Sequence, residues 1–123
     1  EIASCLVGSE MCIRDRSYYD AIEKLIQSNL FDQVGHPDVI KLYSIDPGYD
    51  LHPTYHHIAR LANEYKIKME DNTKAHYSYH HPDIGLNADF RNILKENNVK
   101  IVTASDAHYP NDVGRCFELL DPR

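Results

Sequence analysis

The clearest candidates for chemistry are Asp106 and His108, two residues apart just after the β-branched run 99–103. In an extended strand, residues with this spacing point in the same direction, and the following loop lets them spread around a bound ion. A hard carboxylate oxygen together with an imidazole nitrogen suits Zn, Mn or Fe better than Ca. The spacing alone fits a helix cap equally well, with Asp106 accepting backbone N–H groups and His108 solvated.

A second candidate ligand is His36, in the segment Gly35-His36-Pro37-Asp38 at the end of a brief candidate strand. The glycine allows close backbone approach, and the proline fixes the exit of the chain. A histidine at a strand end can also be a hydrogen-bonded structural residue, so this position is open between the two roles.

Polar residues also stand at the end of the candidate strand 67–70 and directly after it. Glu70, Asp71 and Asn72 could orient metal ligands or bind a substrate. Alternatively, they cap the turn that follows the strand.

The chain contains eight histidines in 123 residues, and imidazole is the commonest protein ligand for transition metals. The first group is His52, His56 and His57. A proline splits it and it lacks the glutamate base of an HExxH zinc motif, so we expect these three histidines to lie on the exposed surface. A second group lies among tyrosines, either lining a substrate pocket or forming ordinary polar surface: His76, His80 and His81. We expect Cys116 to be a small core residue of the last helix rather than a nucleophile.

Hydrophobic periodicity predicts alternating helices and strands. Apolar residues recur at three- and four-residue spacing in three segments, which predicts three helices: 18–29, 53–65 and 88–97. Short apolar or β-branched runs predict three strands: 31–36, 67–70 and 99–103. A turn, a long loop and a last helix complete the pattern: 46–48, 72–86 and the segment opened by Pro110.

Strands that alternate with helices imply a parallel sheet, either open or closed into a barrel. In both arrangements the functional face lies beyond the carboxyl ends of the strands. His36, Glu70, Asp106 and His108 all fall at such ends. We therefore expect these side chains to converge on one face of an α/β fold.

The formal net charge of −6, with acidic and basic residues interspersed, provides no basic face for a nucleic-acid backbone and no polybasic membrane anchor. No apolar run approaches the roughly 20 residues of a membrane-spanning helix. The three cysteines form no close pair and leave an odd thiol, which argues against a disulfide framework. These features predict a cytoplasmic protein, and they indicate no oligomeric state.

The first residues differ in style from the rest of the chain. Residues 4–16 have no steady helical period or strand alternation and resemble a translated sequencing adapter. We therefore expect residues 1–16 to be a non-native leader and residues 17–123 to carry the fold. The alternative is a frayed natural N-terminus.

Three motifs resemble, in order and approximate spacing, the C-terminal motifs of histidinol phosphatases of the polymerase and histidinol phosphatase (PHP) superfamily: 31–41, 69–73 and 102–114. The similarity covers nearly everything from Tyr18 to Leu120, and the Ser-Asp-Ala-His block is its most specific part. It implies part of a distorted seven-stranded β/α (TIM-like) barrel that holds up to three divalent metal ions, Zn, Mn or Fe.

The resemblance also implies residue roles. His36, Asp106 and His108 match metal ligands, and Asp106 would also assist proton transfer. Glu70 and Asn72 match a Glu-X-Asn-Thr motif that orients ligands and substrate. Asp71 stands where that motif usually has an aliphatic residue, which departs from the family's packing there.

The family's early His-X-His motif and its other N-terminal ligands, including a bridging glutamate, have no counterpart in this sequence. We therefore expect a C-terminal part of the domain that binds metal poorly and is inactive alone. The resemblance implies that the full-length parent hydrolyses phosphate monoesters, with histidinol phosphate as the best-known substrate and a small phosphorylated molecule as its partner. The alternatives are a nucleotide or nucleic-acid phosphoesterase of the same superfamily and a noncatalytic metal-binding module.

Overall fold

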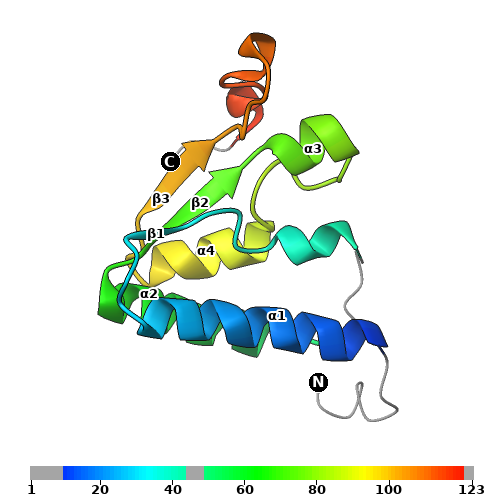
Figure 1. The fold of residues 1–123 in the computed structure, drawn as a ribbon. Coiled ribbons are helices and arrows are strands. Elements are labelled where there is room, and N and C mark those ends of the chain that lie inside the picture. The colour runs from blue at the N-terminus through cyan, green and yellow to red at the C-terminus, as the bar shows by residue number, and fades with distance from the viewer. Residues whose placement is uncertain (1–9, 44–48, 121–123) are drawn as a thin grey trace.

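A computed structural model describes residues 10–43 and 49–120 of the chain, with side chains from residue 13 onward. Three parallel strands form one sheet in the order β1-β2-β3. Figure 1 shows α1, α2 and α4 stacked on one side of the strands, with α3 beyond the strands' carboxyl ends. The α/β class and the parallel sheet predicted from the sequence are therefore confirmed.

The strands are β1 (Gln33–Val34), β2 (Lys68–Asn72) and β3 (Ile101–Ala104). β2 lies in the centre, because Val34 is in register with Met69 on one side and Asn72 with Ala104 on the other. Its side chains alternate between the two faces of the sheet. This alternation sends Met69 and Asp71 into the interior and leaves Glu70 and Asn72 on the opposite face.

The core joins the three long helices through a row of aromatic rings. The helices are α1 (Glu10–Gln27), α2 (His52–Tyr65) and α4 (Ala88–Glu96), and α2 packs against both others. Tyr19 of α1 meets Tyr55 of α2 edge to face at 6.4 Å between ring centroids, and Tyr55 stacks on Phe90 of α4 at 4.4 Å. Such ring pairs add about 0.5–1.5 kcal/mol each beyond the area they bury.

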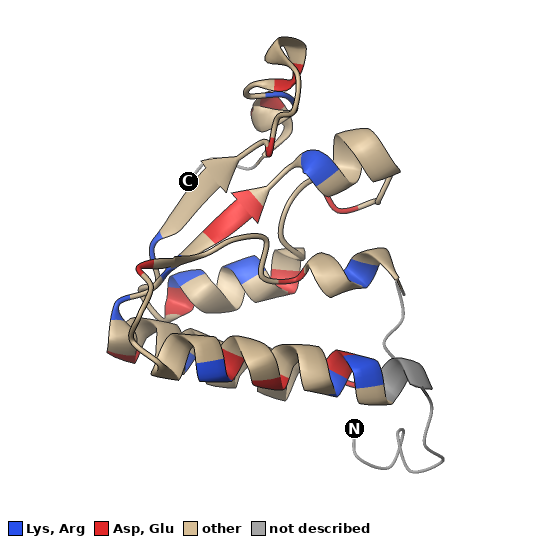
Figure 2. Ribbon diagram, in the orientation of Figure 1, with Lys and Arg blue, Asp and Glu red and all other residues tan. Residues whose placement is uncertain are grey.

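α1 confirms the helix predicted over 18–29 but begins earlier, at Glu10. The residues before Ser17 lack an apolar stripe, yet they are held by contacts with a distant part of the chain. Arg14 lies over the ring of Tyr43 and Arg16 over the ring of Tyr49, at 5.5 and 4.5 Å. Figure 2 shows basic and acidic positions interspersed along this helix. Residues 1–9 of the expected leader and the expected turn at 46–48 lie outside the described residues.

Two predictions about the C-terminal half are wrong. The segment predicted as one long loop contains α3 (Lys74–Tyr79), which has no apolar stripe and buries only Ala75. The predicted last helix is replaced by two short 3-10 turns, η3 (Pro110–Asp112) and η4 (Phe117–Leu119). Left-handed backbone at Gly114 and Cys116 interrupts any helix between them. Cys116 is half-buried at the start of η4 rather than in the core.

No helix among residues 10–43 and 49–120 combines the length and the apolar character needed to cross a bilayer.

His52 links the starts of α2 and α4 at the surface. Its Nδ1 lies 2.7 Å from Oδ1 of Asp50, and its Nε2 lies 3.2 Å from Oδ2 of Asp89. The hydrogen bond with Asp50, together with the two nearby carboxylates, raises the pKa of His52. Because the folded-state pKa exceeds the unfolded value of about 6.5, this contribution is complete below that pH and is lost as pH rises through the folded pKa.

We therefore expect the contribution of His52 to the free energy of unfolding to fall between pH 6 and pH 8, and His52→Asn to remove this small but measurable part of the pH dependence. Denaturant titrations at the two pH values measure the difference. His56→Asn, at another exposed histidine of α2, is the matched control. If the two variants show equal pH dependence, His52 is not the group responsible.

Candidate functional site

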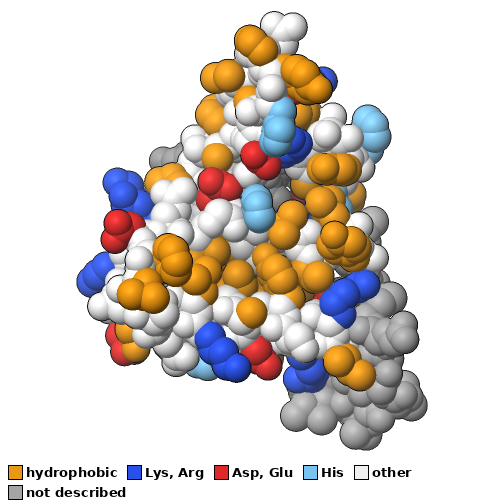
Figure 3. Space-filling view, in the orientation of Figure 1, with side chains coloured by type: hydrophobic (Ala, Val, Ile, Leu, Met, Phe, Trp, Pro, Cys, Tyr) orange, Lys and Arg blue, Asp and Glu red, His pale blue; other side chains and the backbone are white. Residues whose placement is uncertain are grey.

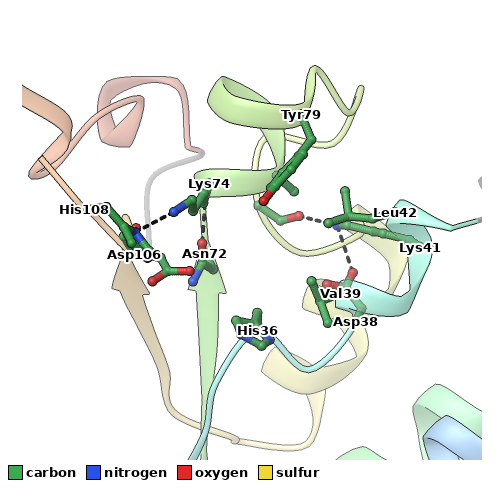
Figure 4. A pocket seen from close by; sticks show the side chains of 12 residues that line it. His36, Asp38, Val39, Lys41, Leu42, Asn72, Lys74, Tyr79, Asp106 and His108 are labelled. Carbon is green, nitrogen blue, oxygen red and sulfur yellow. Dashed lines mark hydrogen bonds and ion pairs between the residues drawn. The ribbon is translucent and has the colours of Figure 1, made fainter.

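A pocket of about 300 Å³ lies at the carboxyl edge of the sheet, between β2, β3, α3 and the short 3-10 segment η2 (Val39–Leu42). Its polar lining includes His36, Asn72, Lys74, Asp106 and His108. Figure 4 shows these side chains arriving from three strand ends and from the first residue of α3. In Figure 3, histidine, acidic and basic side chains gather on the same face. Of the four strand-end residues expected to converge, His36, Asp106 and His108 line this pocket and Glu70 does not.

Glu70 holds the exits of β1 and β2 together. Its Oε1 accepts the backbone N–H of His36 at 3.0 Å and the side-chain amide of Asn72 at 2.8 Å. Asn72 in turn accepts the backbone N–H of Lys74 through its Oδ1 at 2.9 Å. Glu70 thus fixes the backbone from which the His36 side chain projects, while Asn72 also caps the turn into α3.

The loop after β3 carries Asp106 and His108, and both side chains are exposed to the pocket. The chain turns out of the strand at Asp106, whose φ of 49° lies in the left-handed region. The preceding residue anchors this turn, because the buried Ser105 accepts the hydroxyl of Tyr77 through its carbonyl and the N–H of Gly114 through its Oγ. Asp106 does not cap η3, whose N-cap residue is Tyr109.

Lys74 is a pocket residue that the sequence reasoning missed. It is the first residue of α3, and its Nζ contacts Nδ1 of His108. An ammonium group has only donors, so Nδ1 of His108 is the acceptor in this contact. The carbonyl of Asp106, 3.0 Å from the same Nδ1, then has no proton to accept from that nitrogen. Its position two residues after Asn72, next to a predicted strand end, was the available signal. Its side chain could not be placed in the pocket without α3, which the hydrophobic periodicity did not predict.

The opposite wall of the pocket contains a second lysine, Lys41 of η2. Its Nζ donates to Asp38 at 3.0 Å, to Asp83 at 3.2 Å and to the carbonyl of Gly85. Asp38 is buried and also accepts the backbone N–H of Asn87 at 2.9 Å. Burial raises the pKa of Asp38, while the adjacent Lys41 opposes that rise. Lys41 therefore clamps the loop before α4 against η2.

Asp71 faces away from the pocket, into the interior beside α4. Its Oδ1 accepts the backbone N–H of Leu86 at 2.7 Å, and its Oδ2 lies 3.7 Å from the guanidinium of Arg91. The loop passes so close that a Cβ on Gly85 would meet Oδ1 of Asp71 at 1.9 Å. The suggestion that Asp71 caps the turn after its own strand is therefore wrong, because its partners lie on the loop and helix that follow.

The remaining histidines divide between surface and interior. The first group is exposed as predicted: His52, His56 and His57. Of the second group, His76 donates through Nδ1 to the carbonyl of His81, and the ring of His81 is buried against Lys41 and Asp83. Burial lowers the pKa of His81. None of these six lines the 300 Å³ pocket, although the neighbouring Tyr79 does.

The donor types at the pocket suit the metal ions that the resemblance implies, since two imidazoles and a carboxylate match Zn, Mn or Fe. The number of donors does not. Across residues 10–43 and 49–120, no three histidine, cysteine, aspartate or glutamate side chains are grouped so that they could hold one ion. His36 comes from β1 and the other two donors from the end of β3, with β2 between them. Within the described residues, the ligand set is thus incomplete.

Comparisons with protein-family models, with curated proteins and with solved structures found no match to this chain.

Proposed function

We propose that this chain is the C-terminal part of a metal-dependent phosphoesterase, and that the full-length parent hydrolyses small phosphate monoesters in the manner of PHP-type histidinol phosphatases. In this proposal the three parallel strands belong to a larger seven-stranded β/α barrel. The observation that carries it is the presence of His36, Asp106 and His108 around one pocket of about 300 Å³ at the carboxyl edge of the sheet.

The chemistry of the pocket supports a phosphate ester as substrate. It combines imidazole and carboxylate donors with the cation of Lys74, and its size accommodates a small monoester rather than a polynucleotide. The net charge of −6 gives no general attraction for a nucleic-acid backbone.

The residues of the chain would have three roles: metal binding, positioning and proton transfer. His36, Asp106 and His108 would hold divalent ions jointly with ligands from the rest of the parent, and such ions lower the pKa of bound water and neutralise phosphoryl charge. Glu70 positions the backbone of His36 through its 3.0 Å hydrogen bond, and Asn72 positions Lys74. Asp106, exposed to the pocket, would also accept a proton during the reaction.

The test is hydrolysis of an aryl phosphate by the full-length parent, first treated with a chelator and then supplied with Mn or Zn. We expect hydrolysis only after metal addition, and we expect Asp106→Ala to lower kcat by at least about tenfold through weaker metal binding. Asp32→Ala, at an exposed carboxylate outside the pocket, is the matched control.

Two outcomes would contradict the proposal. Metal-dependent hydrolysis that survives Asp106→Ala unchanged would refute the role of that residue. A metal-loaded parent that hydrolyses no phosphate monoester would refute the function itself.

A further inference from the structure

We propose that Lys74 anchors the phosphoryl group of the substrate, and that the pocket selects phosphate monoesters of small apolar or aromatic alcohols. This inference rests on the proposed function and deepens it, because it assigns the two ends of the pocket to the two ends of one substrate.

The charges of the pocket single out Lys74. Two lysines line it, and Lys41 is committed to two carboxylates, those of Asp38 and Asp83. Lys74 forms no ion pair with a carboxylate among the described residues, and its Nζ contacts only the ring of His108. An ammonium group has three N–H donors, so two are available to phosphoryl oxygens. A lysine used in this way binds phosphate as a point charge.

The position of Lys74 is fixed where its side chain begins. Its backbone N–H is bonded to Asn72 at 2.9 Å, and the adjacent Thr73 is buried with its hydroxyl donating to the carbonyl of Arg115 at 2.7 Å. The side chain therefore projects from a rigid point directly after β2. Figure 4 shows its amine reaching toward His108 and Asp106, at the end of the pocket that holds the candidate metal ligands.

The other end of the pocket holds most of its apolar lining, beside Lys41 and Asp38, whose charges are paired with each other. Val39 and Leu42 of η2 face Ala75 and Tyr79 of α3 across it, and Figure 4 shows Tyr79 and Leu42 on the side away from His108. An ester whose phosphate is bound at Lys74 would direct its alcohol portion toward this wall. The apolar side chains and the face of the tyrosine ring favour an apolar or aromatic group over a hydroxyl-rich one, because Val39, Leu42 and Ala75 offer no side-chain hydrogen bonds to replace those with water.

Binding to the 123-residue chain in metal-free buffer tests the inference without any turnover. We expect phenyl phosphate to bind more tightly than glycerol 1-phosphate, and Lys74→Met to weaken phenyl phosphate binding at least about tenfold, as expected for a charge-assisted hydrogen bond. Lys74→Arg should retain most of the affinity. Lys100→Met removes an exposed lysine before β3, at the far end of the strand, and is the matched control.

A second variant separates the two ends of the pocket. Tyr79→Ser should weaken the binding of phenyl phosphate while leaving that of inorganic phosphate unchanged. Circular dichroism confirms that each variant is folded. The inference is overturned if wild-type chain binds no phenyl phosphate, if Lys74→Met binds it as tightly as wild type, or if glycerol 1-phosphate is preferred.

Failure of this inference is distinguishable from failure of the proposed function. If the parent hydrolyses phosphate monoesters but Lys74→Met leaves its KM unchanged, the anchor is wrong and the function stands. If the binding results are as expected while the metal-loaded parent hydrolyses nothing, the pocket is an organic-phosphate site without this activity.

Discussion

Replacing Asp71 by leucine is expected to destabilise the chain by about 3–5 kcal/mol, the usual cost of removing one partner from a buried ion pair. Asp71 is fully buried, and Arg91 beside it is 7% exposed. The substitution removes the acceptor of the Leu86 N–H group, bonded at 2.7 Å, and the carboxylate 3.7 Å from the guanidinium. Denaturant-induced unfolding of both proteins measures the difference in free energy.

Two further variants separate the causes of this loss. Asp71→Asn keeps an oxygen that can accept the Leu86 N–H but removes the charge, so we expect an intermediate loss. The double substitution Asp71→Leu with Arg91→Met removes both charges together, and buried ion pairs replaced in this way are often neutral in stability. The double variant should therefore recover much of the loss. A single Asp71→Leu variant as stable as wild type would show that the pair is not needed.

Lys41→Met is expected to cost about 2–3 kcal/mol at neutral pH, because it leaves the buried carboxylate of Asp38 without its cation. Lys41 is bonded to Asp38 at 3.0 Å and to Asp83 at 3.2 Å. Burial already raises the pKa of Asp38 in the folded chain, and loss of the lysine would raise it further. The same change would release the loop before α4 from η2 and loosen the pocket wall at Gly85.

The cost of Lys41→Met should also depend on pH with a defined sign. A carboxyl group whose folded-state pKa exceeds its unfolded value of about 3.9 destabilises the fold as pH rises from that value through the folded pKa. The variant should thus approach wild-type stability near pH 4 and fall behind it at pH 7. Lys95→Met, which removes an exposed lysine of α4, is the matched control. An equal cost at both pH values would exclude Asp38 as the affected group.

The parts of the fold that were predictable are those with a local pattern. α2 and α4 match the expected segments because each places apolar residues on one face, and the short apolar runs form the expected parallel strands. The position of His36, Asp106 and His108 around one pocket followed from the rule that parallel strands end at the same edge.

The parts that were missed depend on distant contacts. α3 has no apolar stripe. Its start is fixed by two hydrogen bonds: Asn72 accepts the backbone N–H of Lys74, and the Thr73 hydroxyl donates to the carbonyl of Arg115. Asp71 and Arg91 are 20 residues apart on different elements, and neither residue type signals burial in a sequence. Lys74 became visible only when α3 placed it beside His108.

The central strand also divides the chain's tolerance of substitution in two. Positions 69 and 71 face the helices, so substitutions there mainly affect whether the chain folds. Positions 70 and 72, one step along the same strand, lie on the other face and hold the backbone that carries His36 and Lys74, so variation there will change the geometry of the pocket. A library randomised at positions 70 and 72 alone would therefore mainly alter how His36 and Lys74 are presented to a ligand, whereas one that also included 69 and 71 would consist mostly of unfolded chains.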